Sequence, residues 1–305
     1  MFQRVLVCTD FHDGVQRLLQ FIPELAASGI QHLMFLHCVP LWEEGEIPRA
    51  NQSVIDRAEQ RFQAALADLG SPDILNIEVT FEVRSGAPDE NIMQVADRFQ
   101  ADVLILGATT RNFLTEKLFG STTAKLANRM RRPLLTLRPQ LISTYTGAEL
   151  ALRCQHLFRC LLVPFDGSAA AQYLIEYLTQ QVGDFCHYQN GGALSCPEAF
   201  QQCHLVWIQD DAVRRVPQSY RQEEAETQLA QAQQALETIG LTVTTEIRQG
   251  EPLQQLLDVA TERDISAIAV SSRRANALLD WSIPSFSNEV MRRSWHPVLF
   301  IPPQL

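Results

Sequence analysis

Two short segments of the sequence carry residue types that suit a phosphorylated ligand. The longer one, residues 104–122, runs from an apolar stretch into Gly107 and ends with Gly120, Ser121 and Thr122. Glycines let backbone N–H groups approach phosphate closely, and a hydroxyl at the start of a helix adds a donor and the helix dipole. The alternative is simple turn chemistry, which any alternating strand–helix fold requires after a strand.

The second segment contains Asp10, which follows the apolar run Val5–Cys8. A carboxylate in this place can accept hydrogen bonds from ribose hydroxyls. Its structural alternative is a cap for the following helix or a partner for loop amides. His12 lies between Asp10 and Asp13, which suggests acid–base chemistry. No nucleophile or oxyanion donor can be assigned beside it, so catalysis is not expected.

The sequence repeats itself. Asp10 and Asp166 occupy matching positions 156 residues apart, and residues 79–107 match residues 243–271 at an offset of 164. The second offset continues without a gap into the closing apolar run of each copy. We interpret the chain as a tandem duplication.

Each copy alternates between continuous apolar runs and apolar residues at helical spacing. Continuous apolar strands separated by helices predict a parallel sheet covered on both faces. We therefore predict an α/β fold with two Rossmann-like, doubly wound domains, each with a five-stranded parallel sheet. The predicted domains are residues 1–138 and 159–305, joined by a linker at 139–158. Copy two also carries an insertion centred on residues 183–202, which we expect to form a surface loop.

The fold rule selects the places where a ligand can bind. In an open parallel sheet, ligands lie beyond the carboxyl ends of the strands, where the strand order reverses. This selects the loops after the first and the fourth strand of each copy. These loops carry Asp10 and Gly107 in copy one, and Asp166 and Ser271 in copy two.

These residues resemble the universal stress protein family in its tandem two-domain form. The resemblance covers nearly the whole chain apart from the linker and the insertion. Nucleotide-binding members carry Gly-x-x-Gly, nine residues and Gly-Ser/Thr after the fourth strand. Here Gly107 begins the motif, Thr110 stands in place of the second glycine, and Gly120 with Ser121 closes it after nine residues. The resemblance implies domains of the adenine nucleotide alpha hydrolase-like fold, with ATP or AMP as the ligand.

The resemblance also implies a role for individual residues of copy one. Asp10 would hold the ribose, and Val39 on the second strand would line the adenine. A Cβ at Thr110 crowds an approaching phosphate. Arg111 and Lys117 offset this electrostatically, or form a solvated basic pair on a surface loop. The candidate cofactor-binding residues are Asp10, Val39, Gly107, Thr110, Arg111, Gly120, Ser121 and Thr122.

Copy two departs further from the family motif. Ser271 and Arg274 replace the two glycines, and Pro284 precedes Ser285 where Gly-Ser is expected. Proline has no N–H to donate and fixes φ, so it removes a donor from the phosphate loop. The residues after Asp166, in contrast, resemble the usual Asp-Gly-Ser of the family. We therefore expect nucleotide in the first domain only.

The composition limits the kinds of binding partner and the cellular compartment that we expect. A net charge of −10 argues against sequence-independent nucleic-acid binding. No apolar run is long enough to span a membrane, and the N-terminus lacks a signal pattern. Seven cysteines at irregular spacing fit a reducing interior. We expect a cytoplasmic protein without membrane or nucleic-acid partners.

A group of cysteines and histidines raises a metal hypothesis. The group consists of Cys186, His187, Cys196, Cys203 and His204. Its spacings fit no zinc pattern, so we predict no metal site and interpret the group as an incidental thiol-rich loop leading into a strand.

The leading interpretation is a non-enzymatic stress-response protein that binds an adenine nucleotide in copy one. The alternative is a nucleotide-free scaffold that acts through protein partners, both nucleotide sites having decayed. A third class, an adenylyl-transferring or nucleotide-hydrolysing enzyme, lacks a Walker-type Lys-Ser/Thr. Family members pair through the last strand of each unit, so residues 133–138 and 297–302 would form an intramolecular pseudo-dimer. Two chains would form a homodimer if they associate further, which the sequence does not decide.

Overall fold

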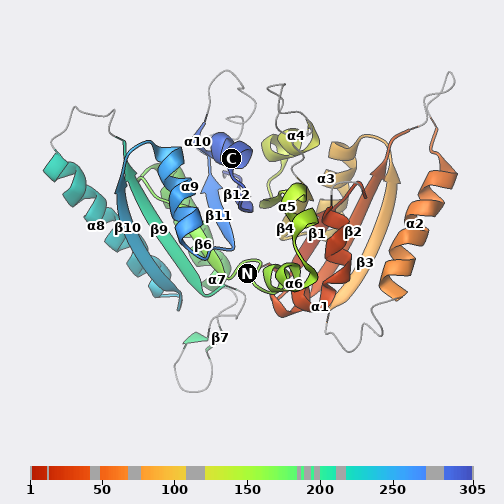
Figure 1. The fold of residues 1–305 in the computed structure, drawn as a ribbon, viewed down its shortest axis with the longest axis horizontal. Coiled ribbons are helices and arrows are strands. Elements are labelled where there is room, and N and C mark those ends of the chain that lie inside the picture. Colours follow the sequence, from red (N-terminus) through yellow and green to blue (C-terminus); the bar gives the residue numbers. More distant parts are fainter. Residues whose placement is uncertain are drawn as a thin grey trace. The chain divides into compact units, whose positions relative to one another are not determined.

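The computed structural model divides the chain into two compact units, Phe2–Gln155 and His156–Leu305. It describes residues 2–11, 14–41, 49–67, 77–107, 121–183, 187–188, 194–195, 200–210, 218–272 and 285–303. Figure 1 shows both units as sheets covered by helices.

The described part of the first unit contains a parallel five-stranded sheet in the order β3-β2-β1-β4-β5. Its strands are β1 (Arg4–Cys8), β2 (His32–Val39), β3 (Glu78–Ser85), β4 (Val103–Gly107) and β5 (Leu134–Leu137). The central strands are buried almost throughout, as expected for a sheet covered on both faces. The predicted α/β class and parallel sheet are confirmed.

Helices of the first unit cover the two faces of this sheet (Figure 1). They are η1 (Val15–Gln20), α1 (Ile22–Ala27), α2 (Gln52–Ala67), α3 (Pro88–Phe99), α4 (Ser121–Arg129), α5 (Pro139–Thr144) and α6 (Gly147–Gln155). The helical spacing of the apolar residues Val15, Leu18, Leu19, Ile22 and Leu25 predicts one helix, but the structure splits this segment into η1 and α1. Pro23 lies in the first turn of α1 and cannot continue the hydrogen-bond ladder of η1.

The segment predicted as a linker, 139–158, is mostly helical. Its polar turn residues, Tyr145 and Thr146, separate α5 from α6. Arg17 of η1 donates to the carbonyls of Ile142 and Tyr145, the latter at 3.1 Å. These contacts, and the packing of α6 against α1, explain why α5 and α6 belong to the first unit.

The second unit repeats this architecture in the order β10-β9-β6-β11-β12. Its sheet consists of β6 (Cys160–Pro164), β9 (Gln202–Gln209), β10 (Thr242–Gln249), β11 (Ala267–Ser271) and β12 (Val298–Ile301). Its helices are α7 (Ala169–Gly183), α8 (Gln218–Glu237), α9 (Pro252–Glu262) and α10 (Phe286–Arg293). The helices α7 and α8 pack together, as do α9 and α10. Within the inserted segment, β7 (His187–Tyr188) and β8 (Leu194–Ser195) pair antiparallel.

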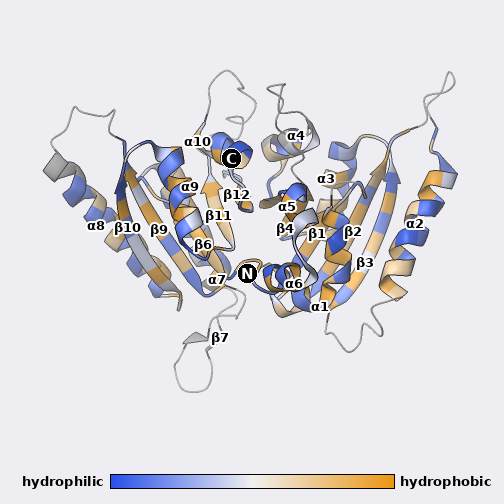
Figure 2. Ribbon diagram, in the orientation of Figure 1, coloured by the Kyte–Doolittle hydropathy of each residue, from blue (hydrophilic) through white to orange (hydrophobic). Residues whose placement is uncertain are grey.

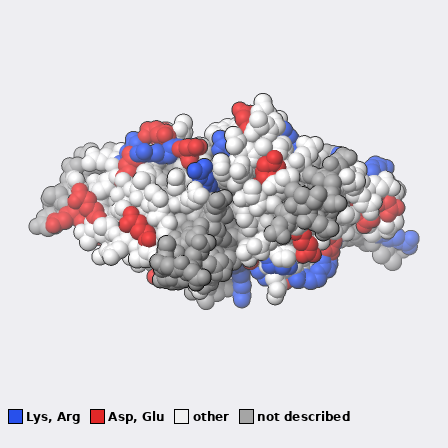
Figure 3. All heavy atoms as spheres, turned by 90° about the horizontal axis from the view of Figure 1, so that it is seen from below, with Lys and Arg blue, Asp and Glu red and all other residues white. Residues whose placement is uncertain are grey.

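Element boundaries reproduce the sequence repeat. The strands β4 and β11, the strands β5 and β12, and the first residues of α3 and α9 are each related by the offset of 164. Figure 2 shows hydrophobic residues concentrated on the strands and a mixed hydropathy on the helices. On the face drawn in Figure 3, described acidic and basic side chains lie interspersed. None of the described helices has the length and hydropathy of a membrane span.

Candidate functional site

The strand order of the first unit reverses between β1 and β4. From β1 the chain moves outward to β2 and β3, whereas β4 and β5 lie on the other side of β1. Cys8, at the end of β1, is in register with Leu106, so the two strands end at the same edge. Asp10 follows β1 and Gly107 closes β4, which places both predicted residues at this reversal.

The loop that carries Asp10 is held by its neighbours. The Thr9 N–H donates to the carbonyl of Leu36 at 3.0 Å, and His37 Nδ1 donates to the carbonyl of Thr9 at 2.8 Å. Phe11 has φ 62°, a left-handed conformation that costs energy for a bulky residue. Its N–H donates to the Thr9 hydroxyl at 3.1 Å. Asp10 itself is exposed at the carboxyl edge of the sheet.

The Phe11 side chain explains why this backbone conformation is retained. Its ring centroid lies 4.7 Å from that of His37 and 4.7 Å from that of Phe62. The guanidinium carbon of Arg61 lies 4.7 Å from the same centroid, in a cation–π contact. The aromatic packing of one residue thus fixes the backbone next to Asp10.

The other predicted residues of the first unit differ in how the structure places them. Val39 ends β2, next to β1, but its side chain is 2% exposed and offers little surface to a ligand. Ser121 begins α4, and Thr122 in its first turn is half-buried. The remaining three, Thr110, Arg111 and Gly120, lie outside the described residues, as do His12 and Lys117.

The corresponding edge of the second unit contains a cavity of about 550 Å³. It opens beyond β6, β9 and β11, where the strand order again reverses, between β6 and β11. The volume lies within the range of about 300–1,000 Å³ that is usual for small-molecule sites. Most of the lining is apolar, with walls from Phe165, Val206, Ile208, Val270 and Phe286.

Carboxylates and hydroxyls complete the lining of this cavity. Asp166 is exposed, and its Oδ1 accepts from the Ser168 N–H at 3.0 Å. Asp210 follows β9 and contributes a second acid. The Ser271 hydroxyl donates to the carbonyl of Ile301 at 2.9 Å, and the Ser287 hydroxyl donates to the carbonyl of Ser271 at 2.5 Å.

Sequence reasoning singled out Asp166 but missed two residues of this cavity. Asp210 corresponds to no acid in copy one, where Pro40 follows β2. Phe286 is the first residue of α10, at the place that Thr122 has after Ser121 in α4. The repeat offset of 164 could have identified Phe286, because it aligns this residue with Thr122. An aromatic ring thus stands where copy one has a hydroxyl that is predicted to bind phosphate.

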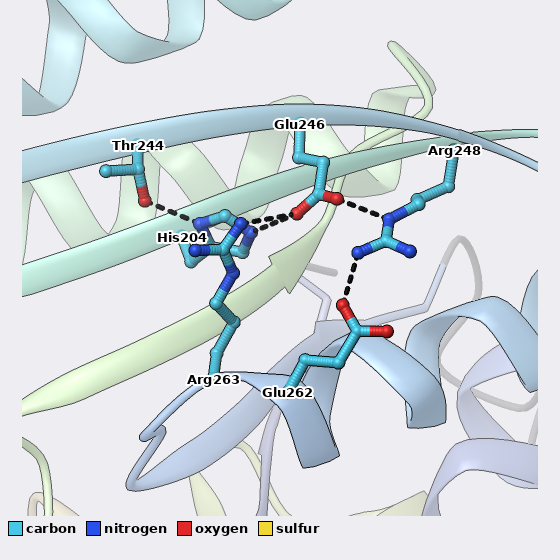
Figure 4. A network of polar contacts seen from close by, with 6 residues as sticks. All are labelled: His204, Thr244, Glu246, Arg248, Glu262 and Arg263. Atoms are coloured by element: carbon cyan, nitrogen blue, oxygen red, sulfur yellow. Dashed lines mark hydrogen bonds and ion pairs between the residues drawn. The ribbon is translucent and has the colours of Figure 1, made fainter.

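A polar cluster on β9, β10 and α9 lies outside the cavity lining (Figure 4). His204 is buried, with Nδ1 2.5 Å from the Thr244 hydroxyl and Nε2 3.2 Å from the Glu246 carboxylate. Arg263 contacts the same carboxylate at 3.0 Å, and Arg248 joins Glu246 to Glu262. The cluster ties the outer strands to α9.

The protonation states within this cluster follow from burial and charge. Burial opposes ionisation of Glu246, but hydrogen bonds from Arg263 and Arg248 outweigh it and lower the pKa of the carboxyl. Burial lowers the pKa of His204 despite its bond to Glu246. A neutral imidazole facing a carboxylate carries its proton on Nε2, so the Thr244 hydroxyl donates to Nδ1.

Of the thiol-rich group, the structure describes His187, Cys203 and His204. Cys203 is 1% exposed within β9, and burial raises the pKa of its thiol. Cys186 and Cys196 lie outside the described residues, and His187 belongs to the short strand β7. Within the described ranges, no group of three or more His, Cys, Asp or Glu side chains is placed to hold a metal.

The chain contains two copies of a doubly wound parallel domain, and the second copy has a ligand-sized cavity where its strand order reverses. These features define the class of tandem Rossmann-like proteins. Two matches to the sequence model of the Universal stress protein family span residues 1–138 and 158–302. The chain therefore belongs to the universal stress protein family.

Individual proteins are similar to this chain in sequence or in fold. A universal stress protein of Methanocaldococcus jannaschii is 23% identical over 159 residues, covering 45% of this chain and 96% of that protein. The structure of a universal stress protein from Archaeoglobus fulgidus has a TM-score of 0.65 at 18% identity, covering 98% of this chain and 96% of that one. A functionally unknown protein from Pseudomonas aeruginosa has a TM-score of 0.56 at 15% identity, covering 99% and 93%. These structures support the fold.

Proposed function

We propose that this protein is a non-enzymatic stress-response protein whose first unit binds an adenine nucleotide, ATP or AMP. The observation that carries the proposal is the placement of Asp10 and Gly107 after adjacent strands, at the point where the strand order reverses. An exposed carboxylate and a glycine at such an edge suit a ribose and a phosphate respectively.

Each part of the nucleotide has a proposed partner. The Asp10 carboxylate accepts from the ribose hydroxyls, and the end of β2 at Val39 borders the adenine. The phosphates lie against the residues between Gly107 and Thr122, with Arg111 supplying positive charge and Ser121 the start of α4. The N–H groups of the first turn of that helix add the favourable end of its dipole.

The proposed nucleotide is a ligand and not a substrate. It favours the conformation to which it binds more tightly, and in this way selects protein partners. The alternative function, a nucleotide-free scaffold, is favoured by Thr110, whose Cβ stands where the family motif has glycine. The cytoplasmic location and the pairing of the two edge strands stay predictions.

Mass spectrometry of protein purified without added nucleotide, followed by calorimetric titration with ATP, tests the proposal. We expect binding by the native chain and its loss in Gly120→Pro, which copies the Pro284 of copy two. Gly147→Ala is the matched control, because this glycine begins α6 and a Cβ there meets no atom within 4 Å. Absence of binding at millimolar ATP would refute the nucleotide proposal and favour the scaffold.

A further inference from the structure

The polar cluster of β9, β10 and α9 contains a hydroxyl, an imidazole and a carboxylate in sequence. The Thr244 hydroxyl lies 2.5 Å from Nδ1 of His204, and Nε2 of the same ring lies 3.2 Å from the Glu246 carboxylate (Figure 4). A hydroxyl bonded to a base, with the base oriented by a third group, is the arrangement that activates a serine or threonine as a nucleophile. The proposed nucleotide site uses none of these side chains.

The three side chains differ in their access to solvent as this chemistry requires. Thr244 is exposed on β10, the outermost strand on its side of the sheet. His204 on the neighbouring strand is 4% exposed, and Glu246 is half-buried. A reagent in solution therefore reaches the hydroxyl, while the imidazole behind it stays shielded from competing water.

The protonation states also suit a general base. Burial lowers the pKa of His204, so its ring is neutral and can accept a proton at pH 7. The charged groups around the ring are Glu246 and Arg248 of β10, and Glu262 and Arg263 of α9. Hydrogen bonds from the two arginines lower the pKa of Glu246 and keep it ionised. This carboxylate stabilises the imidazolium that forms when the ring takes a proton.

The first unit shows that the strand pairing does not require this histidine. Met34 occupies the place of His204 as the third residue of β2, and it is in register with Thr80 on β3. Glu82 follows two residues after Thr80, as Glu246 follows Thr244. The Thr80 hydroxyl oxygen is buried and has no hydrogen-bond partner within the described ranges. The first unit thus has the threonine and the carboxylate without a base between them.

From this geometry we propose that Thr244 is a site of covalent acylation, with His204 as its general base and Glu246 as a positioning residue. The Thr244 oxygen attacks the carbonyl carbon of the acyl donor, and its proton passes to Nδ1 of His204. The bond between that carbon and the leaving group breaks, and the leaving group takes the bonding electron pair. The products are a threonine ester, the free leaving group and an imidazolium that returns its proton to solvent.

The arrangement selects the chemical class of the donor. Activation of the nucleophile is the contribution that these three side chains make, so the donor needs a leaving group that departs without a proton. Acyl phosphates and aryl esters meet this condition. The proposal does not rest on the proposed function, because the reaction uses no nucleotide and none of the residues of the first unit.

Incubation of the full chain with p-nitrophenyl acetate, followed by peptide mapping with mass spectrometry, tests this proposal. General-base catalysis contributes about 100-fold or more. We therefore expect acetylation of Thr244 to be about 100-fold faster than that of Thr242 and Thr245, which are exposed on the same strand. His204→Met, which copies Met34, should remove this advantage. Thr245→Val is the matched control and should leave the acetylation of Thr244 unchanged.

The pH profile separates a general base from a structural histidine. Because the pKa of His204 is lowered, acetylation of Thr244 should persist through the ordinary histidine range and decline below it. Glu246→Gln should slow the reaction and move this decline to lower pH, because loss of the negative charge disfavours the imidazolium. An unchanged profile in this variant would refute the role of Glu246.

Two results overturn the proposal as a whole. One is acetylation of Thr244 that is no faster than that of Thr245 in the native chain. The other is acetylation that stays equally fast in a folded His204→Met chain. The first comparison is made within one native protein, so it decides the question even where the His204 variant does not fold.

Discussion

Replacing Phe11 with alanine removes the ring that fixes the backbone beside Asp10. The side chain is 7% exposed and lies between the rings of His37 and Phe62, each 4.7 Å away between centroids. Buried Phe→Ala substitutions cost about 3–5 kcal/mol. The contact with Arg61, 4.7 Å from the ring centroid, adds about 0.5–1 kcal/mol that is also lost.

Replacing Phe11 with glycine separates the energetic contribution of the ring from that of the backbone conformation. Alanine still has to adopt φ near 62°, which costs about 1–2 kcal/mol for an L-residue with a Cβ. Glycine avoids this cost but loses about 0.5–1 kcal/mol through the entropy of the unfolded chain. We therefore expect Phe11→Gly to be more stable than Phe11→Ala by up to about 1.5 kcal/mol, although both are far less stable than the native chain.

Hydrogen exchange during a urea titration, measured by mass spectrometry, gives the free energy of unfolding of each unit from its own peptides. Phe11→Ala should lower this free energy for peptides of β1 and β2 by about 3.5–6 kcal/mol. Peptides of β6 and β9 in the second unit serve as the internal control. A loss below about 1 kcal/mol in the first unit, or an equal loss in both units, would refute the role given to Phe11.

The remaining predictions concern three other side chains. Burial lowers the pKa of His204 in the folded state, so the unfolded chain binds more protons as the pH falls through the ordinary histidine range, and the free energy of unfolding decreases. His204→Met should flatten the dependence of this free energy on pH between pH 7 and pH 5, and Met34 holds the same third position in β2 of the first unit. An unchanged slope would contradict this. Burial raises the pKa of the Cys38 thiol to about 11, so roughly one thiol in a thousand is ionised at pH 8. Iodoacetamide should therefore label Cys38 far more slowly in the native chain than in the urea-unfolded chain. Equal labelling rates would exclude a buried Cys38 thiol. Asp89→Asn weakens the ion pairs that join α3 to Lys125 at 3.5 Å and Arg129 at 3.3 Å on α4. It should lower the free energy of unfolding, measured in urea, by about 1–2 kcal/mol at low salt and by less at high salt. A loss that is independent of salt would point to packing instead.

The sequence predicted the fold well where the signal is local. Continuous apolar runs identify strands such as β4 and β11 because a strand buried on both faces has no polar alternation. The break between η1 and α1 also has a local cause in Pro23, which the apolar spacing alone conceals. The helices α5 and α6 were missed because polar turn residues dominate that stretch, whereas their order depends on contacts such as those made by Arg17.

The residues of the candidate site also divide into those that the sequence predicts and those that depend on contacts between strands. The positions of Asp10 and Gly107 at one edge follow from topology, which a general rule for parallel sheets supplies. The contribution of Asp210 to the second cavity requires β9 and β6 to be neighbours. The cluster around His204 likewise depends on the register that places Thr244 opposite it on β10. Composition and spacing carry no information about such pairings across strands.

The most direct test of the central proposal is the location of bound ATP by hydrogen exchange of the native chain. We predict that ATP protects peptides containing Asp10, the end of β4 and the start of α4, and leaves the peptides of β6 and α10 unchanged. Asp10→Asn should weaken this protection, whereas Asp166→Asn should not. Protection of the second unit by ATP, or no protection anywhere at millimolar ATP, would contradict the proposal that the first unit is the nucleotide site.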